Sequence, residues 1–448
     1  MIISQYYTKF NAAKKNFTSI ILILLIVILF LGLFLLLETK KIKKITNINS
    51  QMIDQYQSEL NRIINKTNYA LIENTDKLTF FLDYNYKRQD LTKFNNNYFE
   101  IIGKKSYLDT YNDDLYLLTS KGKLYKGSML KDKIDFNYLD SNLNNYIYPL
   151  ALIDDENIMR DLLISEDKIF ISLWLYKGNK EGNYGCFKDV VIASNINNIN
   201  FEILYERPVC YPRWKDKNGL KLSEYKDNYI LMTIGDSGHY ADVQSLNSYH
   251  GKIIKINIHS GESTIIASGI RDSLGIYYCA TSKKIFFTDM GPEGGDEINS
   301  FIEKKEVANF GWPISSYGNH YKIENISEEA LEYQNKYAPL YKNHKDYSFI
   351  EPMAYFEKAP PTDIYVKSLN SDNHLIYFLT LGNEIDSSKE HTQSIITLTF
   401  KNNILIEKKI KKMNERLRDL TFFNDKLIIF SEKGNIFYFS PDEIREIF

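Results

Sequence analysis

The chain has 448 residues, of which 44% are hydrophobic, and its 55 Lys and Arg residues nearly balance its 57 Asp and Glu residues. This length accommodates one large β domain or two to three smaller ones. The formal net charge of −2 creates no field that would attract a polyanion, so nucleic-acid binding is not expected.

The first predicted element is a transmembrane helix at Phe17–Leu37, preceded by a cytoplasmic tail at residues 1–16. The run carries no charge and is built almost entirely from Ile, Leu, Val and Phe, and about 20 such residues span a bilayer. No small-residue cleavage site follows it, so we expect an uncleaved anchor. Lysines flank both ends, but long domains translocate largely regardless of such charges. We therefore predict a single-pass protein of a bacterial inner membrane with its C-terminal domain in the periplasm.

Residues 38–69 are predicted to form a short helical stalk. Ile53, Leu60, Ile63 and Ile64 follow mostly helical spacing among polar residues, and the stretch lacks Pro and Gly. Packing of this segment on the following domain is the alternative, and the spacing is compatible with both.

Residues 70–448 are predicted to form an all-β domain, a six-bladed β-propeller. Short β-rich runs alternate with turn signals, and hairpins are expected at residues 115–126, 253–267 and 426–439. The 34 Tyr and 26 Phe residues suit many strands with aromatic cross-strand pairs. Roughly 380 residues, divided into blades of four strands, give about six blades.

Three cysteines bear on the cellular compartment. Cys186 and Cys210 bracket residues 190–205, which read as two strands around a turn, so the ends of the hairpin can meet in a disulfide. Two unrelated buried thiols are the alternative. Cys279 lies in the apolar run 276–280 and is expected in the core rather than as a reactive thiol.

Five motifs between residues 233 and 321 carry a family resemblance. In chain order they are Thr233–Gly238, Leu246–Ile253, Gly269–Gly275, Thr288–Asn299 and Asn309–Pro313. In this order and spacing they resemble the signature of the glucose/sorbosone dehydrogenases, also called soluble aldose sugar dehydrogenases, and Glu415–Leu420 extends the resemblance towards the C-terminus. The resemblance implies a six-bladed propeller that oxidises sugars with pyrroloquinoline quinone (PQQ) and Ca²⁺.

A competing motif lies inside this stretch. Residues 294–298 read Gly-Gly-Asp-Glu-Ile, close to the GGDEF motif of diguanylate cyclases, in which carboxylates hold Mg²⁺. The flanking segments belong to the propeller pattern, and the long mixed α/β sequence of a cyclase is absent. We therefore interpret Asp296 and Glu297 as residues that brace a blade turn.

The resemblance also implies a cofactor site. Because the quinone is a tricarboxylate, its site requires arginines that form forked hydrogen bonds and a cation that polarises the quinone. Arg271, with Asp272 beside it, matches one cofactor-contacting position of the family, and Arg416 and Arg418 match an arginine pair near the last blade. Inter-blade salt bridges are the alternative role of the three arginines.

The Ca²⁺ ligands implied by the resemblance are the backbone carbonyls of Gly291 and Pro292. The sequence departs from the family pattern at three further positions. Met290 replaces a polar residue, and Ser273-Leu274 replace Pro-Gln. In addition, no lysine near Leu381 matches the family's cofactor-binding lysine.

The main departure concerns the catalytic base. The stretch 159–167, where the family carries its catalytic histidine, contains none. Glu166 or Asp167 would need a raised pKa to replace it. His239, in the loop 238–242, is a further candidate base, and His250 is interpreted as structural.

Two functions stay open. The first is a PQQ-dependent sugar dehydrogenase, or a variant with a relocated base. The second is a catalytically degenerate propeller that binds a carbohydrate or a protein partner at the cell envelope. The missing histidine favours the second, and the retained arginines favour an anionic ligand. We expect that the protein does not oxidise glucose.

Overall fold

The computed structural model describes residues 77–81, 105–129, 133–147, 158–179, 185–212, 219–322, 326–382 and 391–447. All of them lie in one compact unit that runs from Thr75 to Phe448. The predicted tail, transmembrane helix and stalk lie outside the described residues. Within the described ranges, no helix is both long and apolar enough to cross a membrane.

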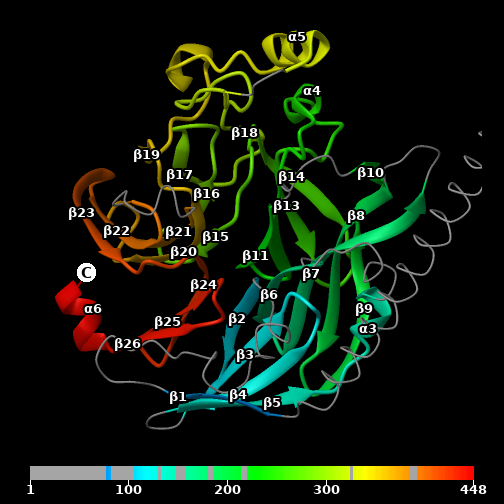
Figure 1. Cartoon of the computed structure of the whole chain (residues 1–448), viewed down its shortest axis with the longest axis vertical. Coiled ribbons are helices and arrows are strands. Elements are labelled where there is room, and N and C mark those ends of the chain that lie inside the picture. The colour runs from blue at the N-terminus through cyan, green and yellow to red at the C-terminus, as the bar shows by residue number, and fades with distance from the viewer. Residues whose placement is uncertain are drawn as a thin grey trace, which may run out of the picture. The chain divides into compact units, whose positions relative to one another are not determined.

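Six sheets surround a common axis (Figure 1), which confirms the six-bladed β-propeller. From the axis outward, the first contains β2 (Ser106–Tyr111), β3 (Asp114–Thr119), β4 (Leu124–Met129), β5 (Lys133–Leu139) and β1 (Lys77–Phe81). The second contains β6 (Met159–Ser165), β7 (Lys168–Asn179) and β8 (Gly185–Asn195), with β9 (Asn198–Glu206) and β10 (Tyr211–Pro212) both paired to β8. The third contains β11 (Gly219–Tyr225), β12 (Tyr229–Ile234), β13 (Lys252–Asn257), β14 (Ser263–Ser268) and β18 (Ala308–Asn309).

The remaining three sheets complete the ring. The fourth contains β15 (Ile276–Cys279), β16 (Lys284–Asp289), β17 (Asp296–Phe301) and β19 (Ala354–Phe356). The fifth contains β20 (Pro361–Ser368), β21 (His374–Thr380), β22 (Ser394–Lys401) and β23 (Ile404–Lys412). The sixth contains β24 (Leu417–Phe423), β25 (Lys426–Ser431) and β26 (Ile436–Phe439). The helices of the described residues are short: α3 (Asn144–Ile147), α4 (Tyr240–Val243), α5 (Glu328–Tyr337), a 3₁₀ turn (His344–Tyr347) and α6 (Pro441–Ile447).

The innermost strands β2, β6, β11, β15, β20 and β24 each contact their two neighbours, and the contact between β24 and β2 closes the ring. The three hairpins predicted from turn signals are present as β3–β4, β13–β14 and β25–β26. Closure of the ring brings the starts of six strands from distant parts of the chain to one end of the axis.

The hydrophobic core lies between the blades. In β16, Phe286 packs with Ile364 and Phe378 of the fifth sheet, whereas the next residue, Phe287, packs with Leu231 and Ile253 of the third. Successive side chains of a strand point to opposite faces. A strand such as β16, whose blade packs between two neighbouring blades, is therefore buried on both faces. This explains why the second strand of a blade, counted from the axis, is a nearly continuous apolar run.

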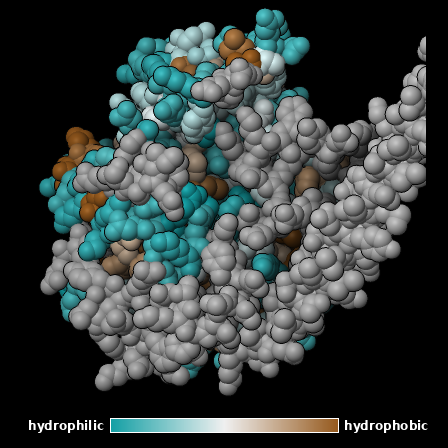
Figure 2. Space-filling view, in the orientation of Figure 1, coloured by the Kyte–Doolittle hydropathy of each residue, from teal (hydrophilic) through white to brown (hydrophobic). Residues whose placement is uncertain are grey.

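Strand β23 is an exposed edge. Ile404, Leu405 and Ile406 are exposed consecutive apolar residues, and Figure 2 shows a hydrophobic area at the left margin, over the β22–β23 hairpin. Lysines follow along the same strand, and charged edges of this kind oppose pairing with a second sheet.

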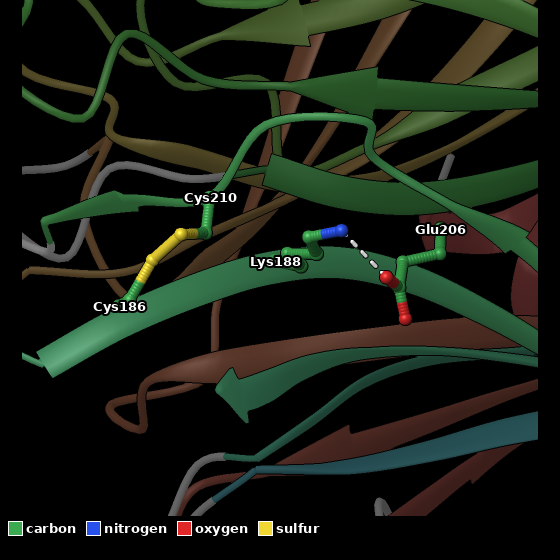
Figure 3. The surroundings of a disulfide bond; sticks show 4 residues. All are labelled: Cys186, Lys188, Glu206 and Cys210. Carbon is green, nitrogen blue, oxygen red and sulfur yellow. Dashed lines mark hydrogen bonds and ion pairs between the residues drawn. A yellow bond between two sulfur atoms is a disulfide. The ribbon is translucent and has the colours of Figure 1, made fainter. Parts of the chain in front are cut away.

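Cys186 and Cys210 form a disulfide with a Cα–Cα distance of 5.5 Å, so the structure confirms the predicted pairing. The chain leaves β9 and returns to β8 as β10, which pairs Tyr211 with Phe187 next to the bond. In Figure 3 Lys188, on the same stretch of β8, forms an ion pair 2.6 Å long with Glu206 of β9. Cys279 is buried, as expected.

Candidate functional site

Hydrogen bonds between neighbouring blades define the end of the propeller where the innermost strands start, which we call the N-terminal face. Arg160 Nη2, in β6, donates to Gly219 O at the start of β11. The amide of Gly219 donates in turn to Asp272 Oδ1, just before β15. Thr362 Oγ1, in β20, donates to Leu417 O at the start of β24. The starts of β6, β11 and β15 are thereby linked to one another, as are those of β20 and β24.

A buried ionic cluster lies inside this face. Lys221 Nζ is 2.7 Å from Asp161 Oδ1, 2.6 Å from Asp419 Oδ1 and 3.7 Å from Asp363 Oδ1. The four residues come from β11, β6, β24 and β20. One lysine therefore joins four blades at the axis.

The carboxylates of this cluster also connect successive blades through the backbone. Asp161 Oδ2 accepts the amide of Leu222, and Asp419 Oδ2 accepts the amide of Leu108. The same pattern recurs where Asp363 Oδ2 accepts the amide of Leu420. Each aspartate lies on one innermost strand and binds the next, so the repeated contact closes the ring.

Burial is the largest influence on the pKa values of Asp161 and Asp363 in this cluster. Burial, partly offset by Lys221, raises the pKa of Asp161 to about 6. Burial raises the pKa of Asp363 well above its ordinary value. For Lys221 burial acts in the opposite direction, but the three carboxylates outweigh it and hold its pKa well above the ordinary value.

The predicted arginines Arg416 and Arg418 converge on one carboxylate. Both guanidinium groups donate to Glu432, which follows β25 in the same blade. Arg416 Nη1 also donates to Gly382 O, 2.7 Å away in the fifth blade. The side chain of Arg418 is 12% exposed and that of Arg416 is 35% exposed, so Arg416 is the more accessible of the two.

The third predicted arginine, Arg271, lies on the same face in the connection before β15. Its Nη1 donates to Met290 O at 2.5 Å and to Gly291 O at 2.6 Å. Its backbone amide and that of Asp272 both donate to the Asp289 carboxylate. Arg271 thus shares the face with Arg416 and Arg418, but its contacts lie within the third and fourth blades.

The carbonyls predicted to bind Ca²⁺ are engaged within the chain. Gly291 O accepts from Arg271, and Pro292 O accepts from the amide of Gly295 at 3.1 Å. A guanidinium in contact with the Gly291 carbonyl repels a second cation at the same oxygen. In this arrangement the carbonyls of Gly291 and Pro292 do not fit Ca²⁺. Arg416 and Arg418 both bind Glu432, so their guanidinium groups are not both available to a tricarboxylate.

Arg160 was not predicted from the sequence as a candidate site residue. It lies in the stretch 159–167, its guanidinium carbon is 4.3 Å from the centroid of the Trp174 ring, and the residue is 5% exposed. Among the described residues its Nε and Nη1 have no hydrogen-bond partner. Nearby Tyr107 lies within the electrostatic reach of Arg160, Lys221 and Arg418, whose charges oppose the burial that raises its pKa.

Of the three candidate replacement bases, Glu166 and Asp167 lie away from this face, and His239 lies on it. Glu166 and Asp167 are the two turn residues between β6 and β7, both with positive φ. Glu166 lines a cavity of about 690 Å³ with residues from the C-terminal parts of β11, β15 and β20 and from the turns after β11 and β15, so it lies at the opposite end of the axis. His239 and His250 lie in the β12–β13 connection on the N-terminal face, and burial lowers the pKa of His250 to about 2.

Asp296 and Glu297 brace the fourth blade, as interpreted from the sequence. Asp296 Oδ2 accepts the amide of Ala359 at 2.9 Å, and Glu297 Oε1 lies 3.2 Å from His344 Nε2. Burial raises the pKa of Asp296 to about 7, with a further contribution from the charge of Glu297.

Replacement of Asp296 by asparagine is expected to change the pH dependence of stability. From the ordinary pKa of 3.8 up to about 7, folded Asp296 keeps a proton that the unfolded chain has lost, so wild-type stability falls as pH rises. The Asp296→Asn variant lacks this titration. Between pH 5 and 6.5, the free energy of unfolding of the variant should therefore rise relative to that of the wild type by about 1.4 kcal/mol per pH unit, as measured by urea denaturation. A difference that stays constant across this window would contradict the assignment.

Comparisons with known proteins point to one family. The sequence model described as Glucose / Sorbosone dehydrogenase matches residues 165–438, more than half of the chain. An uncharacterized protein of Synechocystis, slr1608, is 28% identical over 148 residues, which cover 27% of this chain and 34% of the relative. The aldose sugar dehydrogenase YliI of Escherichia coli is 27% identical over 117 residues, covering 23% and 31%. The matches thus span about a third of these relatives.

A solved structure agrees with the fold. The soluble aldose sugar dehydrogenase of Escherichia coli, in its apo form, superposes with a TM-score of 0.54 at 13% identity, covering 75% of this chain and 96% of that one. At this level of identity the likeness concerns the fold alone.

Proposed function

We propose that this chain, which belongs to the glucose/sorbosone dehydrogenase family, binds an anionic sugar at the N-terminal face of its propeller and does not oxidise it. The observation that supports this most strongly is the buried guanidinium of Arg160, whose Nε and Nη1 lack partners among the described residues. The guanidinium keeps one hydrogen bond, from Nη2 to Gly219 O, and a buried charged group with its other donors unsatisfied is costly. A carboxylate or phosphate group offsets that cost, because it accepts forked hydrogen bonds from a guanidinium.

The surroundings of Arg160 favour an anion. Lys221 and Arg418 extend the positive charge around the hydroxyl of Tyr107. Arg416 is partly exposed beside Arg418 and can turn from Glu432 to a ligand. The deeper aspartates are engaged by Lys221 and by backbone amides, so they do not compete for these arginines.

Redox chemistry is not supported by the same face. Arg160 occupies the strand start where the family's histidine was sought, and a guanidinium is not a base near neutral pH. Glu166 and Asp167 are turn residues at the far end of the axis. The Gly291 carbonyl is bound to Arg271. His239 lies on this face but in the third-blade connection, whereas Arg160 lies in the second blade. These contacts therefore support ligand binding rather than hydride transfer.

The test is calorimetric titration of the full-length protein with glucuronate, glucose 6-phosphate and glucose. Glucuronate or glucose 6-phosphate should bind and glucose should not, and the stronger anion identifies carboxylate or phosphate as the recognised group. Arg160→Gln should weaken binding by about 10- to 100-fold, the usual effect of hydrogen bonds to charged groups. Arg445→Gln, an exposed arginine in α6, is the matched control and should leave binding unchanged.

Two outcomes would contradict the proposal. Equal binding by the wild type and Arg160→Gln would remove Arg160 from the site. Glucose oxidation by the wild type with added PQQ and Ca²⁺ would show that the family's chemistry is retained.

We also propose that the segment Phe17–Leu37 anchors the propeller to a bacterial inner membrane with the domain in the periplasm. The disulfide between Cys186 and Cys210 supports an oxidising compartment, because structural disulfides persist there and are rare in the cytosol. The ligand would then be a carbohydrate of the cell envelope.

A further inference from the structure

The connection between β12 and β13 brings three potential metal ligands together. Because the two strands are antiparallel neighbours, Ile234 pairs with Lys252, and the amide of Gly251 donates to Gly235 O at 3.0 Å. The loop between them therefore returns on itself. His239 and Asp242, at the start and inside α4, consequently meet His250 just before β13.

The geometry of these side chains is close to that of a metal centre. The rings of His239 and His250 are stacked, with centroids 4.2 Å apart and planes inclined by 23°. His239 Nδ1 lies 3.8 Å from Asp242 Oδ2. One ligand atom from each residue lies within 4.8 Å of the other two. Ligands of tetrahedral Zn²⁺ are roughly 3.3 Å apart. A metal ion lies in the plane of each imidazole that binds it, so the two rings must rotate out of their stacked arrangement to close the site.

An independent observation comes from the His250 ring. The residue is 5% exposed, and within the described part of the chain its Nδ1 has no hydrogen-bond partner. The ring also forms a hydrogen bond to the backbone of Asp236. Metal-binding histidines commonly hold their second nitrogen in this way, which fixes the ring and directs the other nitrogen at the metal.

The scaffold around His250 is rigid. Lys252 is fully buried, and its Nζ donates to Val243 O and His250 O, both at 2.6 Å, which ties the end of α4 to the turn that carries the histidine. The ring of Tyr211 packs edge-on against His250. The exposed fraction of the Asp242 side chain is 51%, so this ligand can move towards an arriving ion.

Charged residues of both signs surround His239, Asp242 and His250. Lys252 and Arg207 are cations near His250 and oppose a bound metal ion. Arg207 is paired with Asp189 at 3.1 Å, which offsets its charge. Asp236, whose carboxylate accepts from Trp312 Nε1, contributes a further negative charge beside the loop. The cluster thus brings its own carboxylate, Asp242, into a setting of nearly balanced charge.

We infer that His239, Asp242 and His250 bind a divalent transition-metal ion, of which Zn²⁺ fits the two imidazoles and one carboxylate. Hard cations such as Ca²⁺ and Mg²⁺ prefer oxygen ligands alone, so this donor set disfavours them. Three protein ligands leave a fourth position open for water or for an anionic group. The site lies on the N-terminal face in the third blade and is independent of the proposed sugar binding.

The test is titration of the metal-free full-length protein with Zn²⁺ in competition with a chromophoric chelator, followed by the visible spectrum of the Co²⁺ form. One Zn²⁺ per chain should bind through these residues, and Co²⁺ should give the intense bands of a four-coordinate site. His250→Ala should weaken Zn²⁺ binding by more than about 10-fold, since even loss of a group that orients a ligand costs this much.

Two further variants keep the test decisive if His250→Ala fails to fold. His239→Gln and Asp242→Asn alter more exposed side chains and should weaken Zn²⁺ binding in the same direction. His259→Ala is the matched control, because His259 is an exposed histidine at the far end of β13 and should leave affinity unchanged. Zn²⁺ affinity that is the same in the wild type, His239→Gln and Asp242→Asn would overturn the inference, as would a Ca²⁺ preference.

Discussion

Replacing Lys221 with methionine is expected to destabilise the propeller by about 3–5 kcal/mol, the usual cost of breaking a buried ion pair from one side. Lys221 is 6% exposed and neutralises carboxylates from three other blades. Methionine matches its shape but leaves Asp161, Asp363 and Asp419 close together without a cation. Urea denaturation at pH 7 measures the loss.

The control for this variant is Lys226→Met. Lys226 pairs with Glu303 at 3.2 Å, but its side chain is 47% exposed, so the same substitution should cost less than about 1 kcal/mol. The destabilisation by Lys221→Met should shrink at pH 5, because Asp161 and Asp363, whose pKa values are raised by burial, then take up protons. A loss below 1 kcal/mol at pH 7 would show that the cluster does not hold the blades together.

Removing the disulfide, by replacing Cys186 and Cys210 with serine together, should lower the free energy of unfolding by about 3.5 kcal/mol. The bond closes a loop with a sequence separation of 24 residues, and the chain-entropy model gives about this value for such a loop. Reduction by dithiothreitol should have the same effect on the wild type, measured again by urea denaturation.

Cys279→Ala provides the matched control for the disulfide variant. Cys279 is a buried free thiol, so this variant should keep the full sensitivity to dithiothreitol, whereas the double serine variant should lose it. If dithiothreitol left the wild-type unfolding curve unchanged, the bond would contribute nothing to stability, and the support for an oxidising compartment would weaken.

Much of the fold could be predicted because the signals are local. The hairpins β3–β4, β13–β14 and β25–β26 follow from alternating apolar residues and turn residues within a dozen positions. The disulfide followed from the same kind of reasoning, since Cys186 and Cys210 bracket one hairpin. The exposed edge β23 was not foreseen, because its Ile-Leu-Ile run resembles a buried strand when read alone.

The candidate site was predicted only in part. Arg271, Arg416 and Arg418 share the N-terminal face, as expected for a ligand site, but the partner Glu432 and the Arg271 contact with Gly291 were not foreseen. Arg160 lies in the stretch 159–167, and its sequence context does not distinguish it from other strand residues. Its proposed role depends on the hydrogen-bond partners that its Nε and Nη1 lack in the folded chain. A local sequence pattern cannot show which partners are absent.

The blade hairpins and the family signature can be predicted from the amino-acid sequence, because each depends on residues close together in the chain or on motifs with a set order. The same local pattern made the Cys186–Cys210 disulfide a reasonable expectation, which the folded structure confirms. Which charges meet depends on the folded ring. Lys221 reaches Asp419 across 198 residues, and His250 reaches His239 through the pairing of β12 with β13. Such contacts arise because ring closure, driven by apolar packing between blades, brings the strand starts together at one axis.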